Sequence, residues 1–323
     1  MVKKKAFVSG ISGMDGKSLS ELLLSKDYEV YGIIRRHSIA ENQDYRLRNI
    51  EDKINLDYGD LLDFSALTRL MHLIQPDEIY NLAAQSHVRI SFDIPLFTIQ
   101  TNALGTANML ESYRQNCPHA RYYQASSSEM FGNSFDDDGF QRETTPMHPV
   151  SPYGAAKLMG FSLVKNYRHS YKLFACNGIL FNHSCKFRGS NFVEQKIIKS
   201  AVEISKGLRD KLVLGNLDSF RDFGHSKDYV RAMNLILNHS EPDDFVVATG
   251  ETHSIREICE YVFDKLNLKC QDHIEQDAKF MRPEELKYLK GDSTKIRSVL
   301  GWKPEYTFHQ ILDEMIENWQ KLL

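Results

Sequence analysis

Long apolar runs are absent from this chain of 323 residues. No stretch approaches the ~18 to 20 consecutive apolar residues that a membrane helix needs. The basic start at residues 1–5 superficially resembles that of a signal peptide, but glycines follow almost at once, so we interpret it as the entry to a first strand. We therefore expect a cytoplasmic protein with no membrane partner.

The cysteine pattern and the net charge argue against several classes of function. The five cysteines are odd in number and form no Cys-x-x-Cys pair, which is typical of reduced thiols in the cytoplasm. Asp222, Asp228, His183 and His225 lack the spacing of metal ligands, so no metal is predicted. A formal net charge of -3 gives no electrostatic reason to expect a nucleic acid as a partner.

The first half of the chain alternates short apolar strands with helical patterns. The expected strands are 5–9, 29–34, 54–58, 78–82, 121–125 and 173–180. Repeated strand–helix units predict an α/β fold with a doubly wound parallel sheet of the Rossmann type. Later helices are expected over 192–207, 226–238, 254–266 and 308–322, with strands at 211–214 and 245–248.

A glycine-rich turn follows the first expected strand. Gly10, Gly13 and Gly16 permit a tight turn and a close approach of the backbone to a pyrophosphate, and the next helix begins with free N–H groups. We expect Met14 and Asp15 to contact the same dinucleotide. The alternative is a glycine-rich turn that binds nothing.

Arg35 and Arg36 end the second strand, where NAD-specific proteins usually place an acidic residue that binds ribose. Two guanidiniums suit a 2′-phosphate instead, so we predict NADP; the alternative is a solvated surface pair. Other residues at strand ends are expected to face the cofactor: Asp60, Leu61, Leu82, Ala83 and Ala84. We assign residues 1–180 to the NADP-binding Rossmann domain, to which segments near 211–250 return, and 181–323 mainly to a smaller, interleaved α/β substrate-binding region.

Tyr153-x-x-x-Lys157 places a phenol and an ammonium one helical turn apart. A neighbouring lysine favours the phenolate, so we expect a lowered pKa that makes Tyr153 a base near neutral pH. Glu129 directly follows the serines at 126–128 and is a candidate second base. Alone, each of these residues would more often be an ordinary surface group; together they predict hydride transfer with an additional proton transfer.

Longer motifs identify a resemblance over nearly the whole chain. They lie at 10–16, 75–82, 175–183, 216–228 and 301–304. The chain resembles the extended short-chain dehydrogenase/reductase superfamily and, within it, the GDP-mannose 4,6-dehydratases. The resemblance implies a tightly bound NADP, a GDP-linked hexose as substrate, and a homotetramer or homodimer.

The resemblance also implies roles for the catalytic residues. Tyr153 would take the proton of the sugar 4-hydroxyl, Glu129 the proton on carbon 5, and Lys157 would orient the nicotinamide ribose. Ser127, which stands where the family usually has threonine, would bond the 4-oxygen, and Ser128 would neighbour the departing 6-hydroxyl. NADP would accept hydride from carbon 4 and return it to carbon 6, leaving a GDP-4-keto-6-deoxyhexose.

Binding residues are carried over in the same way. The resemblance implies cofactor contacts at Ser86, His183 and Arg188. It implies substrate contacts at Ser86, Ser127, Glu129, Asn182, Val193, Lys196, Gly215, Arg221, Arg282 and Glu285.

The chain departs from the family at Ser127 and at residues 184–187, where the family pattern Glu-Ser-Pro-Arg becomes Ser-Cys-Lys-Phe. Preserved catalytic motifs beside altered neighbours favour a changed hexose, so we expect GDP-N-acetylglucosamine rather than GDP-mannose. Two other hypotheses remain open: an epimerase or reductase of nucleotide sugars, which needs Tyr153 and Lys157 but not Glu129, and a non-catalytic dinucleotide-binding scaffold.

Overall fold

The computed structural model describes residues 2–36, 45–281 and 283–323. Its centre is a sheet of seven parallel strands in the order β10-β6-β5-β4-β1-β2-β3. The strands are β1 (Lys5–Ser9), β2 (Glu29–Ile34), β3 (Ile54–Tyr58), β4 (Glu78–Asn81), β5 (Arg121–Ser127), β6 (Ala175–Leu180) and β10 (Asp244–Val247). This is the doubly wound order, with the chain reversing direction across the sheet between β1 and β4.

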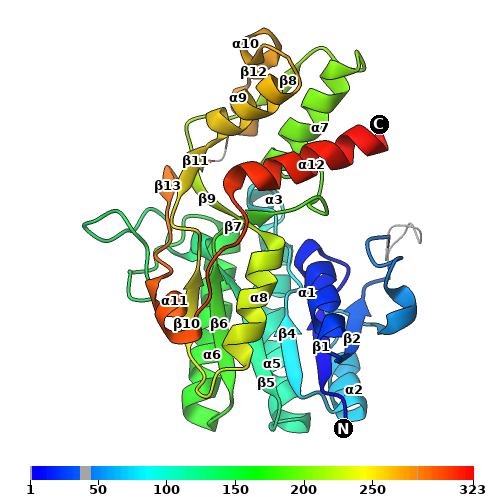
Figure 1. Cartoon of the computed structure of the whole chain (residues 1–323). Coiled ribbons are helices and arrows are strands. Elements are labelled where there is room, and N and C mark those ends of the chain that lie inside the picture. Colours follow the sequence, from blue (N-terminus) through cyan, green and yellow to red (C-terminus); the bar gives the residue numbers. More distant parts are fainter. Residues whose placement is uncertain (1, 37–44, 282) are drawn as a thin grey trace.

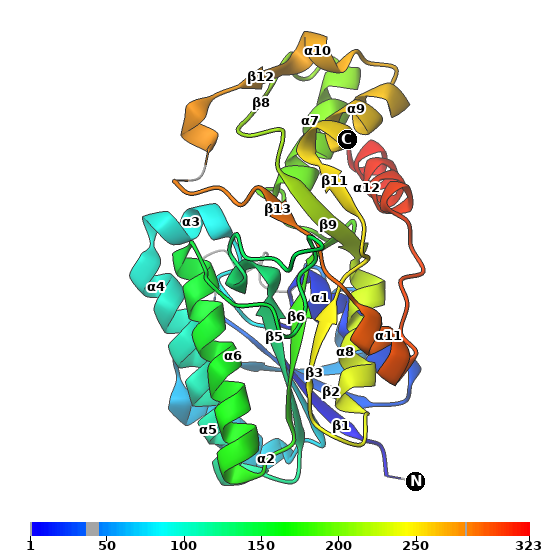
Figure 2. The ribbon, with the colours of Figure 1, turned by 90° about the vertical axis from the view of Figure 1, so that its left-hand side faces the viewer.

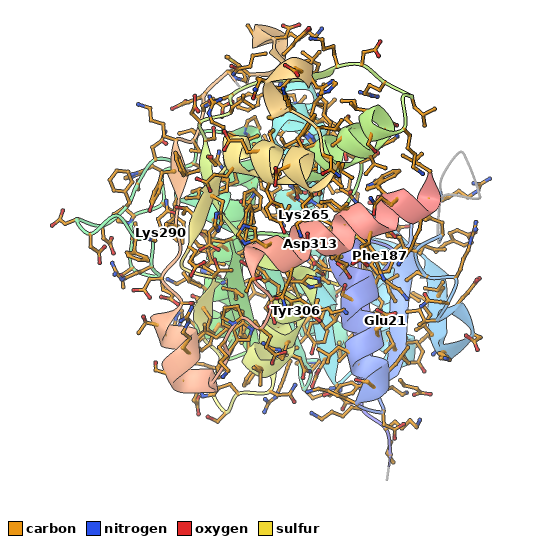
Figure 3. All side chains as sticks on the ribbon, turned by 45° about the horizontal axis from the view of Figure 1, so that its top comes forward. Glu21, Phe187, Lys265, Lys290, Tyr306 and Asp313 are labelled. Carbon is orange, nitrogen blue, oxygen red and sulfur yellow. The ribbon has the colours of Figure 1, made fainter. Side chains whose placement is uncertain are left out.

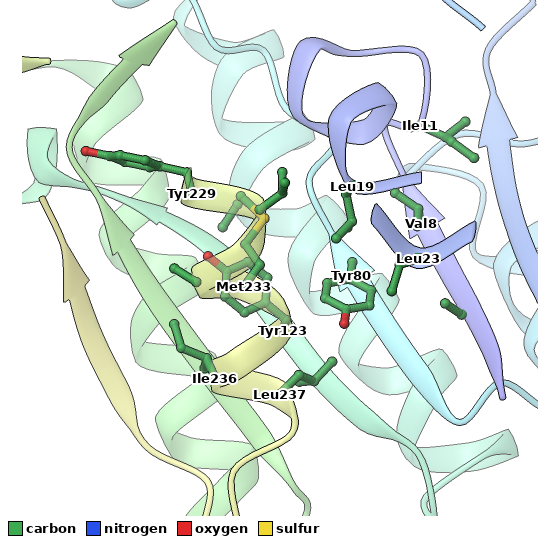
Figure 4. Close-up of a cluster of buried hydrophobic side chains, with 14 of the residues drawn as sticks. Val8, Ile11, Leu19, Leu23, Tyr80, Tyr123, Tyr229, Met233, Ile236 and Leu237 are labelled. Atoms are coloured by element: carbon green, nitrogen blue, oxygen red, sulfur yellow. The ribbon is translucent and has the colours of Figure 1, made fainter. Parts of the chain in front are cut away.

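Helices cover both faces of the sheet (Figures 1 and 2). One layer holds α1 (Met14–Ser25) and α8 (Ser226–Leu237), and the other holds α2 (Phe64–Ile74), α5 (Gly105–Asn116) and α6 (Pro152–Tyr171). Figure 4 shows the first layer closing on the sheet, where Leu23, Tyr80 and Met233 meet in a core that excludes water. The sheet and these helices form what we call the sheet lobe.

Helix α6 begins at Pro152, where the sequence has a capping serine followed by a proline. The Ser151 side chain accepts a hydrogen bond from Gly154 N at 3.0 Å, and Pro152 occupies the first turn, where its missing N–H costs nothing. The helix ends at Lys172 in the left-handed region, with φ 56°. Tyr153 and Lys157 are thereby fixed in the first two turns, beside the carboxyl end of β5.

Three short elements shape the far side of the sheet lobe: α3 (Val88–Asp93), α4 (Pro95–Ile99) and a π-turn η3 (Gln100–Leu104) that leads into α5. The π-turn contains Asn102. Its side-chain Oδ1 accepts a hydrogen bond from Gln85 N at 2.8 Å, and its Nδ2 donates to Gln85 O at 2.9 Å. Asn102 therefore holds the segment that follows β4 in place at the edge of the sheet.

A second group of elements, which we call the upper lobe, lies above the carboxyl ends of the strands (Figure 2). Its strands β7 (Asn182–Ser184), β11 (Thr252–Ser254) and β13 (Tyr288–Leu289) all pair with β9 (Phe220–His225). Its helices α7 (Val193–Ser205), α9 (Ile255–Lys265) and α12 (Phe308–Leu322) enclose a separate core. The remaining elements are β8 (Leu212–Leu214) paired with β12 (Ile274–Gln276), α10 (Cys270–His273), α11 (Thr294–Leu300) and the 3₁₀ turns η2 (Glu51–Lys53), η4 (Ser128–Met130) and η5 (Ala278–Phe280).

The expected elements are present, with ends shifted by a few residues. The strand at 245–248 joins the main sheet as β10, whereas the strand at 211–214 is β8 and pairs with β12 in a small sheet of its own. The Ser254 hydroxyl caps α9 by accepting from Glu257 N at 3.0 Å, as its position predicts. The division of the chain at residue 180 stays a prediction. Across the described ranges, no helix is long and apolar enough to cross a membrane.

Candidate active site

A cavity of about 540 Å³ lies between the carboxyl ends of the strands and the upper lobe. This is the edge where open parallel sheets bind ligands. Most of the predicted site residues line it together: Asp15, Leu82, Ala84, Ser86, Ser127, Ser128, Glu129, Tyr153, Lys157, Asn182, His183, Arg188, Val193, Lys196, Gly215, Arg221 and Glu285. Arg282 lies outside the described residues.

The glycine turn at one end of the cavity has room for nothing but glycine. Gly10 has φ 71°, and a Cβ there would lie 2.8 Å from the backbone of Ala83. A Cβ on Gly16 would lie 2.3 Å from the Gly10 carbonyl. Gly13 begins α1 without any side-chain cap, so the first N–H groups of this helix are left to a ligand. The turn fits a pyrophosphate.

Asp15 links this turn to the upper lobe. Its carboxylate lies 2.8 Å from His183 Nε2 and accepts from Ser226 Oγ at 2.8 Å. Burial alone would raise the pKa of Asp15, but His183 and Ser226 outweigh it and hold the pKa below its usual range. The cofactor end of the cavity is therefore tied to both β7 and α8.

The proposed bases meet at the end of β5. This strand continues into the turn η4, which places Ser127, Ser128 and Glu129 side by side, and all three are buried. Across from them Tyr153 is 8% exposed, and the nearby Ser127 hydroxyl acts to lower the pKa of its phenol. A hydroxyl, a carboxylate and a phenol thus converge on one region of the cavity.

The predicted lowering of the Tyr153 pKa is wrong. Burial raises the pKa of this phenol to about 12, and the nearby Ser127 hydroxyl only partly offsets that effect. The Lys157 ammonium does not supply the expected stabilisation, because it lies 5.8 Å from the centre of the Tyr153 ring and donates to Ala125 O at 2.8 Å. Burial also lowers the pKa of Lys157 to about 8.

The other end of the cavity is cationic and lies under the upper lobe. Lys196 donates to Val213 O at 2.6 Å and lies 4.1 Å from the Phe280 ring centre, while Arg221 donates to Phe220 O at 2.8 Å. Burial, with the nearby Arg209 and Lys279, lowers the pKa of Lys196. This end is suited to an anionic, partly planar group such as a nucleoside diphosphate.

Several predicted cofactor residues lie beside this cavity rather than on its wall. Gly10, Gly13, Met14 and Gly16 form the turn itself, and Ala83 supports Gly10. Arg35 follows β2 directly and Asp60 lies two residues after β3, with Arg35 Nη1 3.9 Å from Asp60 Oδ2, and Arg36 follows Arg35 in the chain.

Leu61 is 3% exposed and packs in the core against α2 and α5. Its expected contact with the cofactor stays a prediction.

Sequence patterns missed several residues that line the cavity. They belong to α3, to connections and to the upper lobe: His87, Arg89, Asp93, Asn191, Phe192, Glu194, Asn216, Ser219, Phe223, Ile255, Lys279 and Phe280. The turn that places Phe280 and Lys279 has no motif, although the mixture of aromatic and basic residues at 279–282 is a weak signal for a nucleotide contact. Throughout the described ranges, no group of three His, Cys, Asp or Glu side chains could hold a metal ion.

The order of the strands, the glycine turn and the tyrosine–lysine helix define an extended short-chain dehydrogenase/reductase. Comparison with known proteins agrees. The chain aligns over 99% of its length with RMD from Pseudomonas aeruginosa, solved with NADPH, covering 100% of that chain at 26% identity and a TM-score of 0.82. The dTDP-glucose 4,6-dehydratase of Bacillus anthracis, solved with NAD, shares the fold, with a TM-score of 0.85 at 22% identity over 98% of this chain and 97% of that one.

The family can be stated more narrowly. A family model described as GDP-mannose 4,6 dehydratase matches residues 7–315. GDP-mannose 4,6 dehydratase 1 of Arabidopsis thaliana is 46% identical over 327 aligned residues, which cover 98% of this chain and 89% of the relative. The chain belongs to the GDP-mannose 4,6-dehydratase family.

Proposed function

We propose that this protein is a GDP-mannose 4,6-dehydratase that uses bound NADP. The observation that carries the proposal is the convergence of Tyr153, Ser127 and Glu129 in one buried cavity, with Lys157 beside them. A dehydrogenase needs one proton acceptor, whereas elimination of water from a keto sugar needs a second base at carbon 5. Glu129 supplies that base.

We propose GDP-mannose as the substrate in place of GDP-N-acetylglucosamine, which the sequence favoured. That expectation required residues 184–187 to alter the pocket wall. In the described structure, the cavity lining passes from Asn182 and His183 to Arg188, while Ser184 and Cys185 are 1% and 3% exposed and point into the protein. Among these departures only Ser127 lines the cavity, and it keeps a hydroxyl. The choice of hexose is then supported by the relatives, which are named for GDP-mannose.

The chain's own residues divide the proton transfers. Tyr153 accepts the proton of the sugar 4-hydroxyl, and Ser127 holds the same oxygen by its hydroxyl. Glu129 then removes the proton on carbon 5, which the new 4-ketone has acidified, and passes it to the 6-hydroxyl, which leaves as water near Ser128. A bound NADP would supply the hydride acceptor for carbon 4 and the donor for carbon 6, and its cationic oxidised ring would favour the phenolate of Tyr153.

The preference for NADP rests on Arg35 and Arg36. Arg35 directly follows β2 with its side chain 64% exposed, which leaves it accessible to a 2′-phosphate. Replacing both arginines with glutamine should raise the Kd for NADP about tenfold and leave the Kd for NAD nearly unchanged. Equal losses for both cofactors would show that the pair is ordinary surface charge.

The substrate is tested by turnover of GDP-mannose and GDP-N-acetylglucosamine side by side, with loss of one water followed by mass spectrometry. A higher kcat/KM for the N-acetyl sugar would overturn the hexose and leave the reaction intact. Glu129→Gln separates the dehydratase from an epimerase or reductase, because only the dehydratase needs a second base. Retention of full turnover by this variant would favour the epimerase or reductase.

The protein also presents an apolar face that suits a second copy. Ile94, Leu96 and Phe97 on or beside α4, Leu104 in the π-turn and Met159 on α6 are 39–74% exposed. Contacts between α4 and α6 bring this face together, which supports a homodimer or homotetramer. Light scattering that shows a monomer at micromolar concentration would disprove it. The cytoplasmic location stays a prediction.

A further inference from the structure

The short segment 185–188 is held by side chains from three other parts of the chain. All three carbonyls from Lys186 to Arg188 accept hydrogen bonds: Gln195 Nε2 donates to Lys186 O at 3.2 Å and to Arg188 O at 3.0 Å, and Arg46 Nε donates to Phe187 O at 2.9 Å. Lys186 N donates to Glu314 of α12 at 3.3 Å. Backbone held at so many points has little freedom to move.

This segment ends in a side chain of the active site. Arg188 lines the cavity, where its guanidinium lies 3.6 Å from the Phe192 ring centre and its Nε lies 3.1 Å from Glu194 Oε1. These contacts hold the guanidinium of Arg188 in place only if the backbone of Arg188 is also held in place. The position of the guanidinium therefore depends on the backbone of the segment.

Gln195 is the junction of the arrangement. It is 1% exposed on α7, and while its amide nitrogen bonds the segment, its Oε1 accepts from Trp319 Nε1 at 2.7 Å. Trp319 belongs to α12, the last helix of the chain. The segment contacts both helices, since Lys186 N donates to Glu314 of α12 and Lys17 Nζ of α1 lies 5.9 Å from the Phe187 ring centre; Figure 3 labels Phe187 between α12 and Glu21 of α1.

We propose that Gln195 is a positioning residue for Arg188 and that Trp319 acts on the same arginine through Gln195. The indole N–H fixes the orientation of the Gln195 amide, which then presents its nitrogen to the two carbonyls. The C-terminal helix thus acts on Arg188 only through Gln195, since α12 itself does not line the cavity among the described residues. The inference rests on the proposed use of NADP and on the contact with it that the resemblance implies for Arg188.

Two substitutions isolate the two steps. Trp319→Phe keeps an aromatic ring but removes the indole N–H together with part of the ring volume, and Gln195→Met keeps the length of the side chain and removes its amide. We expect the Kd for NADP, measured by calorimetry on protein stripped of cofactor, to rise about threefold for the first and about tenfold for the second. The kcat at saturating cofactor should stay near the wild-type value, because no reacting group is changed.

A matched control comes from another contact of the same helix. Tyr261 on α9 donates to Asp313 of α12 at 2.9 Å, so Tyr261→Phe also removes one hydrogen bond to α12 but none to segment 185–188. It should bind NADP as the wild type does. If Trp319 acts through Gln195, adding Trp319→Phe to Gln195→Met should raise the Kd no further.

Three results would overturn the proposal: wild-type NADP affinity in both variants, fully additive effects in the double variant, or a loss that appears in the Kd for GDP instead of NADP. Arg188→Ala with wild-type NADP affinity would overturn the role of Arg188 and the positioning with it. Should Gln195→Met fail to fold by circular dichroism, Trp319→Phe and its control decide alone. A protein that loses NADP as expected but does not dehydrate GDP-mannose would refute only the substrate.

Discussion

The sheet lobe and the upper lobe contribute to the cavity in different ways. In the sheet lobe, the proposed catalytic side chains stand at the ends of regular elements, as Ser127 does at the end of β5 and Tyr153 at the start of α6. In the upper lobe, strands are short, and Tyr288 of β13 pairs with Phe220 of β9 from far along the chain. The chemistry is therefore fixed by backbone that local sequence determines, and the substrate end by contacts that only the complete fold creates.

The sharpest test of this contrast lies at the catalytic helix. Tyr153→Phe removes the proton acceptor and almost no binding surface, so turnover should fall at least about 100-fold while NADP affinity is kept. Steady-state kinetics and calorimetry measure the two quantities. Retention of a tenth of the activity would mean that another group accepts the proton.

A second test concerns stability and uses a buried ion pair near the C-terminal end of α6. Arg168 Nη2 lies 2.7 Å from Asp244 Oδ1, and both side chains are nearly buried, so the pair joins α6 to the edge strand β10. Arg168→Met leaves the Asp244 carboxylate buried without this partner, which should cost about 3–5 kcal/mol in the free energy of unfolding. Urea denaturation gives that value. Arg168→Met combined with Asp244→Asn should recover part of the loss; a single variant of wild-type stability would show the pair to be dispensable.

The pH dependence of NADP binding should follow the protonation of Lys157. Burial lowers its pKa to about 8, and the ammonium is the form that donates to Ala125 O and is suited to a ribose hydroxyl. As a base with a depressed pKa, it loses its proton as pH rises through about 8, so the affinity for NADP should fall above that pH. Titration of the Kd between pH 6.5 and 9.5 (a range set around that pKa) checks this, with Lys157→Arg as a variant that stays charged. A flat profile would contradict it.

The smallest effect is expected in the upper lobe. Arg256 Nη2 lies 2.8 Å from Asp218 Oδ1, but the side chains are 48% and 68% exposed. Because water screens such a pair, Arg256→Gln should change the free energy of unfolding by less than about 1 kcal/mol. A loss as large as that of Arg168→Met would erase the distinction between the lobes.

Sequence reasoning was most accurate where structure is local. The strands of the sheet lobe, the cap of α9 at Ser254 and the catalytic helix after Pro152 all follow from patterns within a few residues. Those signals act through neighbouring backbone, so they are visible without the fold.

The failures concern properties that depend on burial and on distant partners. The raised pKa of Tyr153 follows from its surroundings in the folded chain, and Lys157, which was expected to favour the phenolate, donates to Ala125 O instead. Residues 184–187 seemed to border the pocket because they adjoin Asn182 and His183, yet β7 turns Ser184 into the interior. Phe280 enters the cavity from a turn that no motif marks.

The place of β10 at the end of the sheet has a consequence for the order in which the chain folds. This strand pairs with β6, yet residues 181–243 separate the two in the sequence. During synthesis, β6 is complete well before its last neighbour has emerged, and until then it presents an unpaired edge of apolar residues. A ribosome-bound or truncated chain that stops short of Asp244 should therefore expose a surface prone to association with other chains, and assembly of the sheet must wait for half of the upper lobe.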